Sequence, residues 1–159
     1  MIDSTTIRAH QHSAGARKSA GPQEIGISRG GRSTKIHAGV DAFGLPIIIV
    51  LSEGQRHDAP FATKLLVLGC DYVLGDKGYD SDVLREEIRK VGAEPVIPAK
   101  GNRVNPPDHD REIYKERNAV ERFFAKIKHF RRVATRYEKL ARNFLAMVTL
   151  AACIVWLRS

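Results

Sequence analysis

The chain has 159 residues, which is enough for one domain with a substantial core and too short for two of ordinary size. Lys and Arg outnumber Asp and Glu by 26 to 18, and the formal net charge of +8 favours polyanionic partners. Cys70 and Cys153 have no CxxC partner, which excludes a cysteine zinc site and favours reduced thiols in a cytoplasmic protein. The opening residues do not read as a signal peptide, and the apolar run 144–157 is too short to span a membrane, so no membrane partner is expected.

The first third of the chain predicts three strands and one long loop. Residues 1–7 form the first strand. A stretch rich in Gly, Ser and basic residues follows at about 10–32 without sustained periodicity, which predicts a long mobile basic loop. Residues 35–41 and 45–52 then read as two strands joined by a tight turn, and β-branched residues fill the second.

Helices and strands alternate in the rest of the chain. A hairpin followed by alternating α and β elements predicts a mixed central β-sheet flanked by α-helices, in a single α/β domain over residues 1–159. The predicted elements after the hairpin are a helix from Asp58 to about residue 68, a buried strand at 70–76, a helix at 82–92, a strand at 93–99, a helix at 114–128 and an apolar terminal helix at about 141–158.

The predicted helix 114–128 has an unusual polar stripe. At about 100° per residue, it would place Tyr114, Arg117 and Lys128 within about 40° of Glu121. The apolar side chains of the same segment gather next to this stripe, on the face that would be buried. A single carboxylate would therefore lie among two cations and a phenol at the margin of a buried surface.

Three acidic residues are candidates for one shared site. Asp3 lies in the first strand and Asp76 ends the fourth, and these strands can lie side by side in a mixed sheet, with Glu121 added by a helix packed near their ends. Clustered carboxylates raise one another's pKa unless a cation joins them, and oxygen-only ligands favour Mg²⁺ or Mn²⁺. Two such ions form the clamp used for in-line displacement at phosphorus. Each acid also has an ordinary explanation, as a turn residue, a cap before Gly78 or an i,i+4 partner of Arg117.

The spacing of the residues around these acids matches a known family. Tyr114, Arg117, Glu121 and Lys128 are separated by two, three and six residues, in that order. This pattern resembles the third-acid motif of bacterial insertion-sequence transposases with a DDE triad. The resemblance covers nearly the whole chain and extends to the second-acid pattern Asp-x-Gly-Tyr at 76–79, the first-acid pattern of Asp before Ser or Thr at 2–5, and the stretches 34–37 and 54–58.

The resemblance implies an RNase H-like α/β fold and a metal-dependent DNA transposase, which cleaves and joins strands by phosphoryl transfer at the ends of an insertion sequence. Asp3, Asp76 and Glu121 would be the catalytic residues and the metal ligands, with Mg²⁺ or Mn²⁺ as the cofactor and two ions expected. The expected partners are double-stranded DNA, at the transposon ends and the target, and a second copy of the chain in a synaptic complex.

Basic side chains and one tyrosine are expected to bind the DNA. Arg117 has a second interpretation, as the residue that orients Glu121, and Tyr114 has one as a core residue with its hydroxyl at the edge. Asp41 competes with Asp3 as the first acid, but its place beside a turn explains it better. The expected DNA contacts are Tyr114, Arg117 and Lys128 from the motif and Arg131, Arg132 and Arg136 from the basic cluster after it.

The chain departs from the family in one respect. Members usually carry a helical end-recognising region before the first acid, whereas Asp3 is the third residue here. We therefore expect a downstream reading frame or a truncated remnant, with a partner chain or fusion supplying end recognition. Two alternatives to a transposase remain at this stage: an RNase H-like nuclease without strand transfer, and an inactive remnant that only binds DNA.

Overall fold

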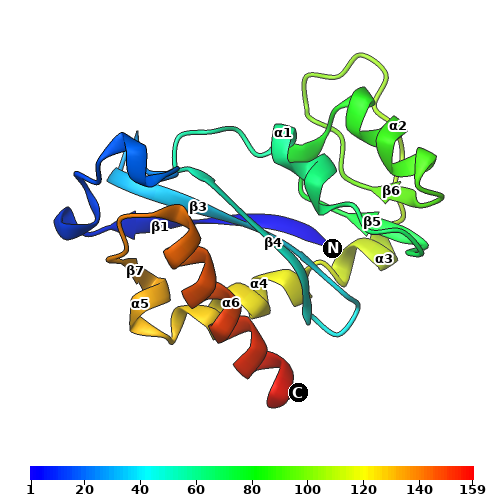
Figure 1. The fold of residues 1–159 in the computed structure, drawn as a ribbon. Helices are drawn as coiled ribbons and strands as arrows, with labels where there is room; N and C mark the ends of the chain where they lie inside the picture. Colours follow the sequence, from blue (N-terminus) through cyan, green and yellow to red (C-terminus); the bar gives the residue numbers. More distant parts are fainter.

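A mixed β-sheet forms the centre of the molecule (Figure 1). The structure is a computed structural model and describes residues 1–159, apart from the side chain of Lys18. The strands of the sheet are β1 (Ile2–Ala9), β2 (Gly26–Ser28), β3 (Gly31–Val40), β4 (Pro46–Glu53) and β7 (Thr135–Arg136). In the described part of the chain, these five strands follow the order β2-β3-β1-β7, with β4 also paired to β3. Because β1 is antiparallel to β3 and parallel to β7, the predicted mixed α/β architecture is confirmed.

Two further strands form a small sheet of their own. β5 (Tyr72–Leu74) and β6 (Glu94–Val96) pair in parallel and are connected through α2 (Asp82–Lys90). The predicted pairing of the first and fourth strands, β1 with β5, is therefore wrong as a backbone ladder. The end of β5 nevertheless packs against the start of β1, since a Cβ atom at Gly75 would lie 3.4 Å from Ile2 Cγ1. Side-chain packing therefore brings the end of β5, which precedes Asp76, next to β1, which carries Asp3.

Helices cover both faces of the central sheet (Figure 1). α4 (Asn118–Lys128) and α6 (Ala141–Leu157) pack on one face, and α1 (Ala59–Ala62) with the 3-10 turn η3 (Thr63–Leu65) packs on the other. Side chains alternate along a strand, so adjacent residues of β3 enter different cores. The α4–α6 core includes Ile7, Ile36, Val120, Phe123, Phe144 and Val148, and the other core includes Ile2, Leu65, Tyr79, Leu84 and Ile88.

The helices of the middle region begin and end at residues suited to those positions. Ser81 caps α2 by accepting a hydrogen bond from the Leu84 backbone N–H at 3.2 Å. Gly92 ends this helix with a φ of 85°, as the left-handed terminal position favours. The preceding helix is shorter than predicted, because α1 ends at Ala62 and a 3-10 turn follows. Asp58 holds the cap position of α1 but makes no capping hydrogen bond.

The helix predicted over 114–128 is two helices. α3 (Arg111–Lys115) ends before Glu116, and α4 begins at Asn118. Between them the backbone makes i→i+3 hydrogen bonds, from Glu116 to Ile113 and from Arg117 to Tyr114. A 3-10 turn winds more tightly than an α-helix. Tyr114 therefore does not belong to one continuous stripe with Glu121, and the predicted geometry is corrected at this point.

The remaining segments are short, except for the terminal helix. The segment 10–32, for which the sequence predicts a mobile loop, contains the 3-10 turns η1 (Gln11–Ser13) and η2 (Lys18–Ala20) as well as β2. α5 (Arg131–Ala134) leads into β7, and α6 closes the chain. Among the described residues, no helix combines the length and apolarity needed to cross a membrane.

Arg136 connects the segment 10–32 to the core. Its side chain is fully buried and donates hydrogen bonds to the backbone oxygens of Gln23 at 2.6 Å, Glu24 at 3.2 Å and Glu138 at 2.9 Å, and to the Thr34 hydroxyl. Burial lowers the pKa of Arg136 to about 10. The expectation that Arg136 contacts DNA is therefore corrected, because its donors are used inside the protein.

We expect Arg136→Met to lower the free energy of unfolding by about 3 kcal/mol or more, because it leaves several buried carbonyl groups without donors at roughly 1–3 kcal/mol each. The exposed Arg131→Met should change it by less than about 0.5 kcal/mol. Urea unfolding of both variants checks this. A folded Arg136 variant of wild-type stability that had lost DNA binding would instead restore the DNA role.

Candidate active site

The first and third predicted acids meet at one guanidinium. Asp3 lies in β1, Glu121 lies in the first turn of α4, and Arg117 occupies the position just before α4. Arg117 Nη1 donates to Asp3 Oδ2 at 2.8 Å, and Nη2 donates to Glu121 Oε1 at 2.6 Å. The Asp3 side chain is 18% exposed and that of Glu121 is 55% exposed, so water screens the second ion pair more strongly. Arg117 thus joins carboxylates from distant parts of the chain.

Asp76 lies close to Asp3 on the other side of the site. It follows β5 and caps the 3-10 turn η4 (Lys77–Tyr79), where its Oδ1 accepts a hydrogen bond from Gly78 N at 2.8 Å. Burial raises the pKa of Asp3, and the neighbouring Asp76 carboxylate raises it further. Hydrogen bonds from the Ser4 backbone and from Arg117 oppose this rise. The Asp3 carboxylate therefore interacts electrostatically with both Arg117 and Asp76.

The predicted DNA contacts lie at two different places. Tyr114 is half-buried on α3, and the Arg117 guanidinium lies 6.0 Å from its ring centroid. Lys128 is exposed at the far end of α4, about 16 Å along an eleven-residue helix from Arg117. Arg131 and Arg132 are exposed on α5, next to Lys128 in the chain. Only Tyr114 and Arg117 are thus brought close to the acids.

A buried polar cluster lies on the opposite face of the sheet. Lys35 Nζ donates to Asp58 Oδ1 at 2.8 Å, and His37 Nδ1 lies 3.8 Å from the same oxygen. His37 Nε2 is 2.7 Å from Ser52 Oγ. The hydroxyl of Tyr79 is buried and makes no well-formed hydrogen bond to the described residues. Burial raises the pKa of Tyr79, and the charge of Asp58 raises it further, which places this hydroxyl near the cluster.

This polar cluster includes residues from two of the stretches that resemble the family. Residues 34–37 and 54–58 supply Lys35, His37 and Asp58, which pack below the turn that carries Asp76. The aromatic ring of His37 stacks on Phe61 at 4.5 Å between centroids, and its side chain is fully buried. Packing against Phe61 and the contact with Ser52 hold the His37 ring in place.

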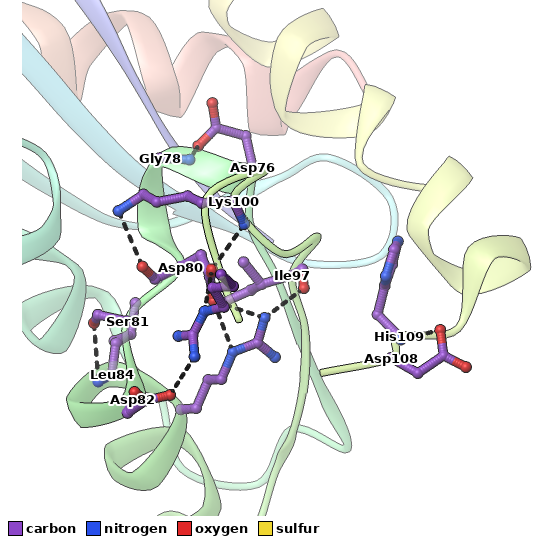
Figure 2. A network of polar contacts seen from close by, with 12 residues as sticks. Asp76, Gly78, Asp80, Ser81, Asp82, Leu84, Ile97, Lys100, Asp108 and His109 are labelled. Atoms are coloured by element: carbon purple, nitrogen blue, oxygen red, sulfur yellow. Dashed lines mark hydrogen bonds and ion pairs between the residues drawn. The ribbon is translucent and has the colours of Figure 1, made fainter. Parts of the chain in front are cut away.

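Asp80, four residues after Asp76, organises a second network (Figure 2). Its carboxylate is fully buried and accepts hydrogen bonds from Arg85 Nε at 3.0 Å, Arg103 Nε at 2.6 Å and the Lys100 backbone at 2.9 Å. Arg103 also donates to Asp82 at 2.7 Å. Burial alone would raise the pKa of Asp80, but the hydrogen bonds from Arg103, Lys100 and Arg85 outweigh it and hold the pKa below its ordinary value.

The Asp80 network fixes a loop beside the second acid. Lys100 Nζ donates to the Asp80 carbonyl at 3.0 Å, and Arg85 donates to the Ile97 carbonyl at 2.7 Å. The loop that follows β6 is therefore held against the start of α2, in the same region as Asp76 (Figure 2). Sequence reasoning missed this network, because an Asp next to the helix cap Ser81 reads as part of the cap. The two cations Lys100 and Arg103, close together in the loop after residue 97, are the signal that points to it.

Asp41 has the turn role that the sequence favours. Its Oδ1 accepts hydrogen bonds from the backbone N–H groups of Phe43 at 2.9 Å and Leu45 at 2.8 Å. Those bonds stabilise the turn between β3 and β4, where Gly44 has a φ of 81°. Asp41 therefore does not compete with Asp3 for the site.

The three predicted acids have the ligand chemistry, but not the spacing, of a divalent-cation site. In the described part of the chain, no three Asp, Glu, His or Cys side chains lie close enough together to hold a metal ion. The three predicted acids nevertheless offer only carboxylate oxygens, which are the ligands Mg²⁺ and Mn²⁺ prefer. A positive group already lies between two of them, and Asp3 and Asp76 repel each other. A divalent cation would relieve that repulsion.

Comparison with known proteins identifies the family. A family model described as a transposase DDE domain matches residues 1–156. The chain belongs to this family. A Brucella ovis protein assigned as the transposase for insertion sequence element IS6501 is 41% identical over 129 residues, which cover 79% of this chain and 99% of that protein. A Burkholderia cepacia protein assigned as the transposase for IS402 is 30% identical over 152 residues, covering 87% and 69% of the two chains. No solved structure matches the chain.

The family establishes the class of reaction. The protein is a DNA transposase, an enzyme that cuts DNA strands and transfers them. Membership also implies a DNA substrate and dependence on a divalent metal. The expectations of transposase function and of metal-dependent chemistry are thus confirmed at the level of the family.

We expect Asp80→Asn to destabilise the transposase by about 3 kcal/mol or more, because breaking a buried ion pair leaves the Arg85 guanidinium buried without its counter-charge. Asp82→Asn is the matched control, since Asp82 is 78% exposed and its pair with Arg103 should contribute less than about 1 kcal/mol. Thermal and urea unfolding measure both. Equal losses for the two variants would contradict the structural importance of the buried carboxylate.

The transposase should lose stability in mild acid through His37. Burial lowers the pKa of His37 to about 4, and the nearby Lys35 and Lys64 favour the neutral ring although Asp58 opposes them. In the unfolded chain the pKa of His37 is about 6.5. The stability that neutral His37 contributes is therefore complete above pH 6.5 and is lost as the pH falls towards 4. The loss between pH 7 and pH 5 should be about 2 kcal/mol.

His37→Gln tests this pH dependence. The variant should be less stable than the wild type at pH 7 but should lack the additional loss of about 2 kcal/mol between pH 7 and pH 5. Urea unfolding at the two pH values gives the difference directly. An identical pH dependence in both proteins would show that His37 is not the titrating group.

Proposed function

We propose that Asp3, Asp76 and Glu121 form the catalytic triad at which this transposase cleaves and joins DNA strands at the ends of an insertion sequence. The observation that carries the proposal is the contact of Asp3 and Glu121 with one guanidinium, although the two acids come from distant parts of the chain. The effect of Asp76 on the pKa of Asp3 supports including it. An ordinary surface pair would account for Glu121, but not for the largely buried contact with Asp3.

The proposed cofactor is Mg²⁺ or Mn²⁺, as two ions held by the three carboxylates. When bound, such ions lower the pKa of the attacking water or 3′-hydroxyl and stabilise negative charge at phosphorus. The carboxylates would serve as deprotonated oxygen ligands, and they differ in how far they are exposed to solvent. Asp3 is largely buried and fixed by β1, whereas the Glu121 side chain is 55% exposed to solvent.

The proposed DNA contacts are the exposed cations that follow the third acid along α4 and α5. Lys128 offers a point charge to phosphate, and Arg131 and Arg132 offer planar forks that bind two phosphate oxygens at once. Arg132 is paired with Glu138, so a DNA phosphate would have to displace that carboxylate. Tyr114 offers its half-buried ring for stacking on a base. The contacts with phosphate would hold the protein on the DNA and would not read its base sequence.

We also propose that residues 1–159 form one RNase H-like catalytic domain. The mixed sheet with helices on both faces supports this arrangement (Figure 1). Transposition joins two ends of one element, so two copies of the site must act together. This requirement supports a homodimer in the synaptic complex.

The test is Mn²⁺ binding by calorimetry with wild type, Glu121→Gln and Glu112→Gln. Glu121→Gln keeps the shape of the side chain and removes one charge, so affinity should fall by more than the roughly 10–100-fold typical of an outer-shell change. Glu112→Gln removes the same charge from an exposed residue paired with Lys115 and should bind like the wild type. Cleavage of DNA carrying the element's ends should follow the same order.

Equal metal affinity in all three proteins, each of them folded, would remove Glu121 from the site. In that case Asp3→Asn and Asp76→Asn would show whether the other two acids bind metal without it. Loss of binding in Glu112→Gln as well would point to a general effect of charge rather than to a specific ligand.

A further inference from the structure

Arg117 uses both terminal nitrogens of its guanidinium on the acids of the site. One terminal nitrogen binds Asp3 at 2.8 Å and the other binds Glu121 at 2.6 Å, so the planar fork is shared between two carboxylates. The Arg117 side chain is only 19% exposed, and neighbouring negative charge raises its pKa despite the opposing effect of burial. It therefore stays positively charged between Asp3 and Glu121.

This arrangement is one that a divalent cation would disturb. A cation bound by Asp3 and Glu121 would need oxygen lone pairs that now accept hydrogen bonds from Arg117. It would also place two positive groups within a few ångströms of each other, and at that distance their repulsion is strong in a partly buried site. The guanidinium and the cation cannot both keep these positions.

We propose that Arg117 is the counter-ion of the metal-free site, and that it competes with the divalent cation for Asp3 and Glu121. On metal binding it leaves the two carboxylates and becomes available to a DNA phosphate. This inference rests on the proposed function, because it takes the two acids as metal ligands. It gives Arg117 two successive partners, where sequence reasoning left a choice between orienting Glu121 and binding DNA.

The surroundings of Arg117 allow such a change. The residue precedes α4 in the tight turn after α3, so its side chain can rotate without breaking the hydrogen bonds of the helix. The half-buried ring of Tyr114 lies 6.0 Å from the guanidinium and offers an alternative, weaker contact. Phosphate is the stronger alternative, because it accepts the same two parallel hydrogen bonds as a carboxylate.

Calorimetric titration of the full chain with Mn²⁺ alone tests the competition. Arg117→Gln frees both carboxylates and should bind Mn²⁺ at least tenfold more tightly than the wild type. Arg122→Gln is the matched control, because it removes the same charge from the exposed residue next to Glu121 and should change the affinity less than about threefold. Arg117→Lys keeps the charge but lacks the planar fork that joins the two acids, so its Mn²⁺ affinity should lie between those of the wild type and Arg117→Gln.

A second measurement uses stability rather than affinity. Without metal, Arg117→Gln leaves the acids unneutralised, so its melting temperature should lie below that of the wild type. Mg²⁺ should then raise the melting temperature of Arg117→Gln more than that of the wild type, because a ligand that binds only the folded state stabilises it more when it binds more tightly. If Arg117→Gln does not fold without metal, Arg117→Lys gives the same comparison.

The outcomes separate this inference from the proposed function. Equal or weaker Mn²⁺ binding by Arg117→Gln, together with weak binding by Glu121→Gln, would overturn the competition and leave the metal site in place. Wild-type binding by Glu121→Gln would overturn the metal site and the inference with it. Tighter binding by Arg117→Gln that is lost in the double variant Arg117→Gln, Glu121→Gln would support both.

Discussion

The alternation of side chains along β1 is the constraint on which the rest of the site depends. Asp3 points to the face covered by α4, where it meets Arg117, whereas Ser4 lies opposite His37 in β3 and faces the other core. A shift of one residue in this register would exchange the two faces and bury the carboxylate among apolar side chains. Seven paired residues between β1 and β3 hold the register, so the position of the first acid is fixed by backbone hydrogen bonds.

Two fully buried charged residues fix segments that have little regular structure. Arg136 holds the segment around Gln23 and Glu24, and Asp80 holds the loop that begins after β6. Buried charges are poor sources of net stability, because their desolvation offsets most of the attraction, but a charge whose hydrogen bonds are all made permits only one arrangement of its partners. Asp80 thereby limits the positions open to the turn that carries Asp76.

The sequence predicts the family and the class of reaction better than it predicts how the chain is built around the three acids. The contexts of Asp3, Asp76 and Glu121 point to one site, because short motifs preserve the spacing of reactive groups. The break between α3 and α4 escapes periodicity, because Glu116 and Arg117 keep helical φ and ψ while their backbone N–H groups bond to residue i−3 rather than i−4. Strands as short as β2 and β7 carry no alternation to detect, and the burial of Arg136 depends on contacts more than a hundred residues away in the chain.

The three acids are held by interactions of unequal rigidity. Asp3 belongs to a paired strand, Glu121 is tied to it through a single guanidinium, and Asp76 is brought near it by side-chain packing, including that of Gly75 against Ile2. No backbone ladder joins β1 to β5 in the described part of the chain, so small relative shifts of Asp76 break no hydrogen bonds of the sheet. A change in the cation between the carboxylates, as proposed for Arg117, would therefore shift Glu121 and Asp76 more readily than Asp3, whose backbone is fixed in the sheet.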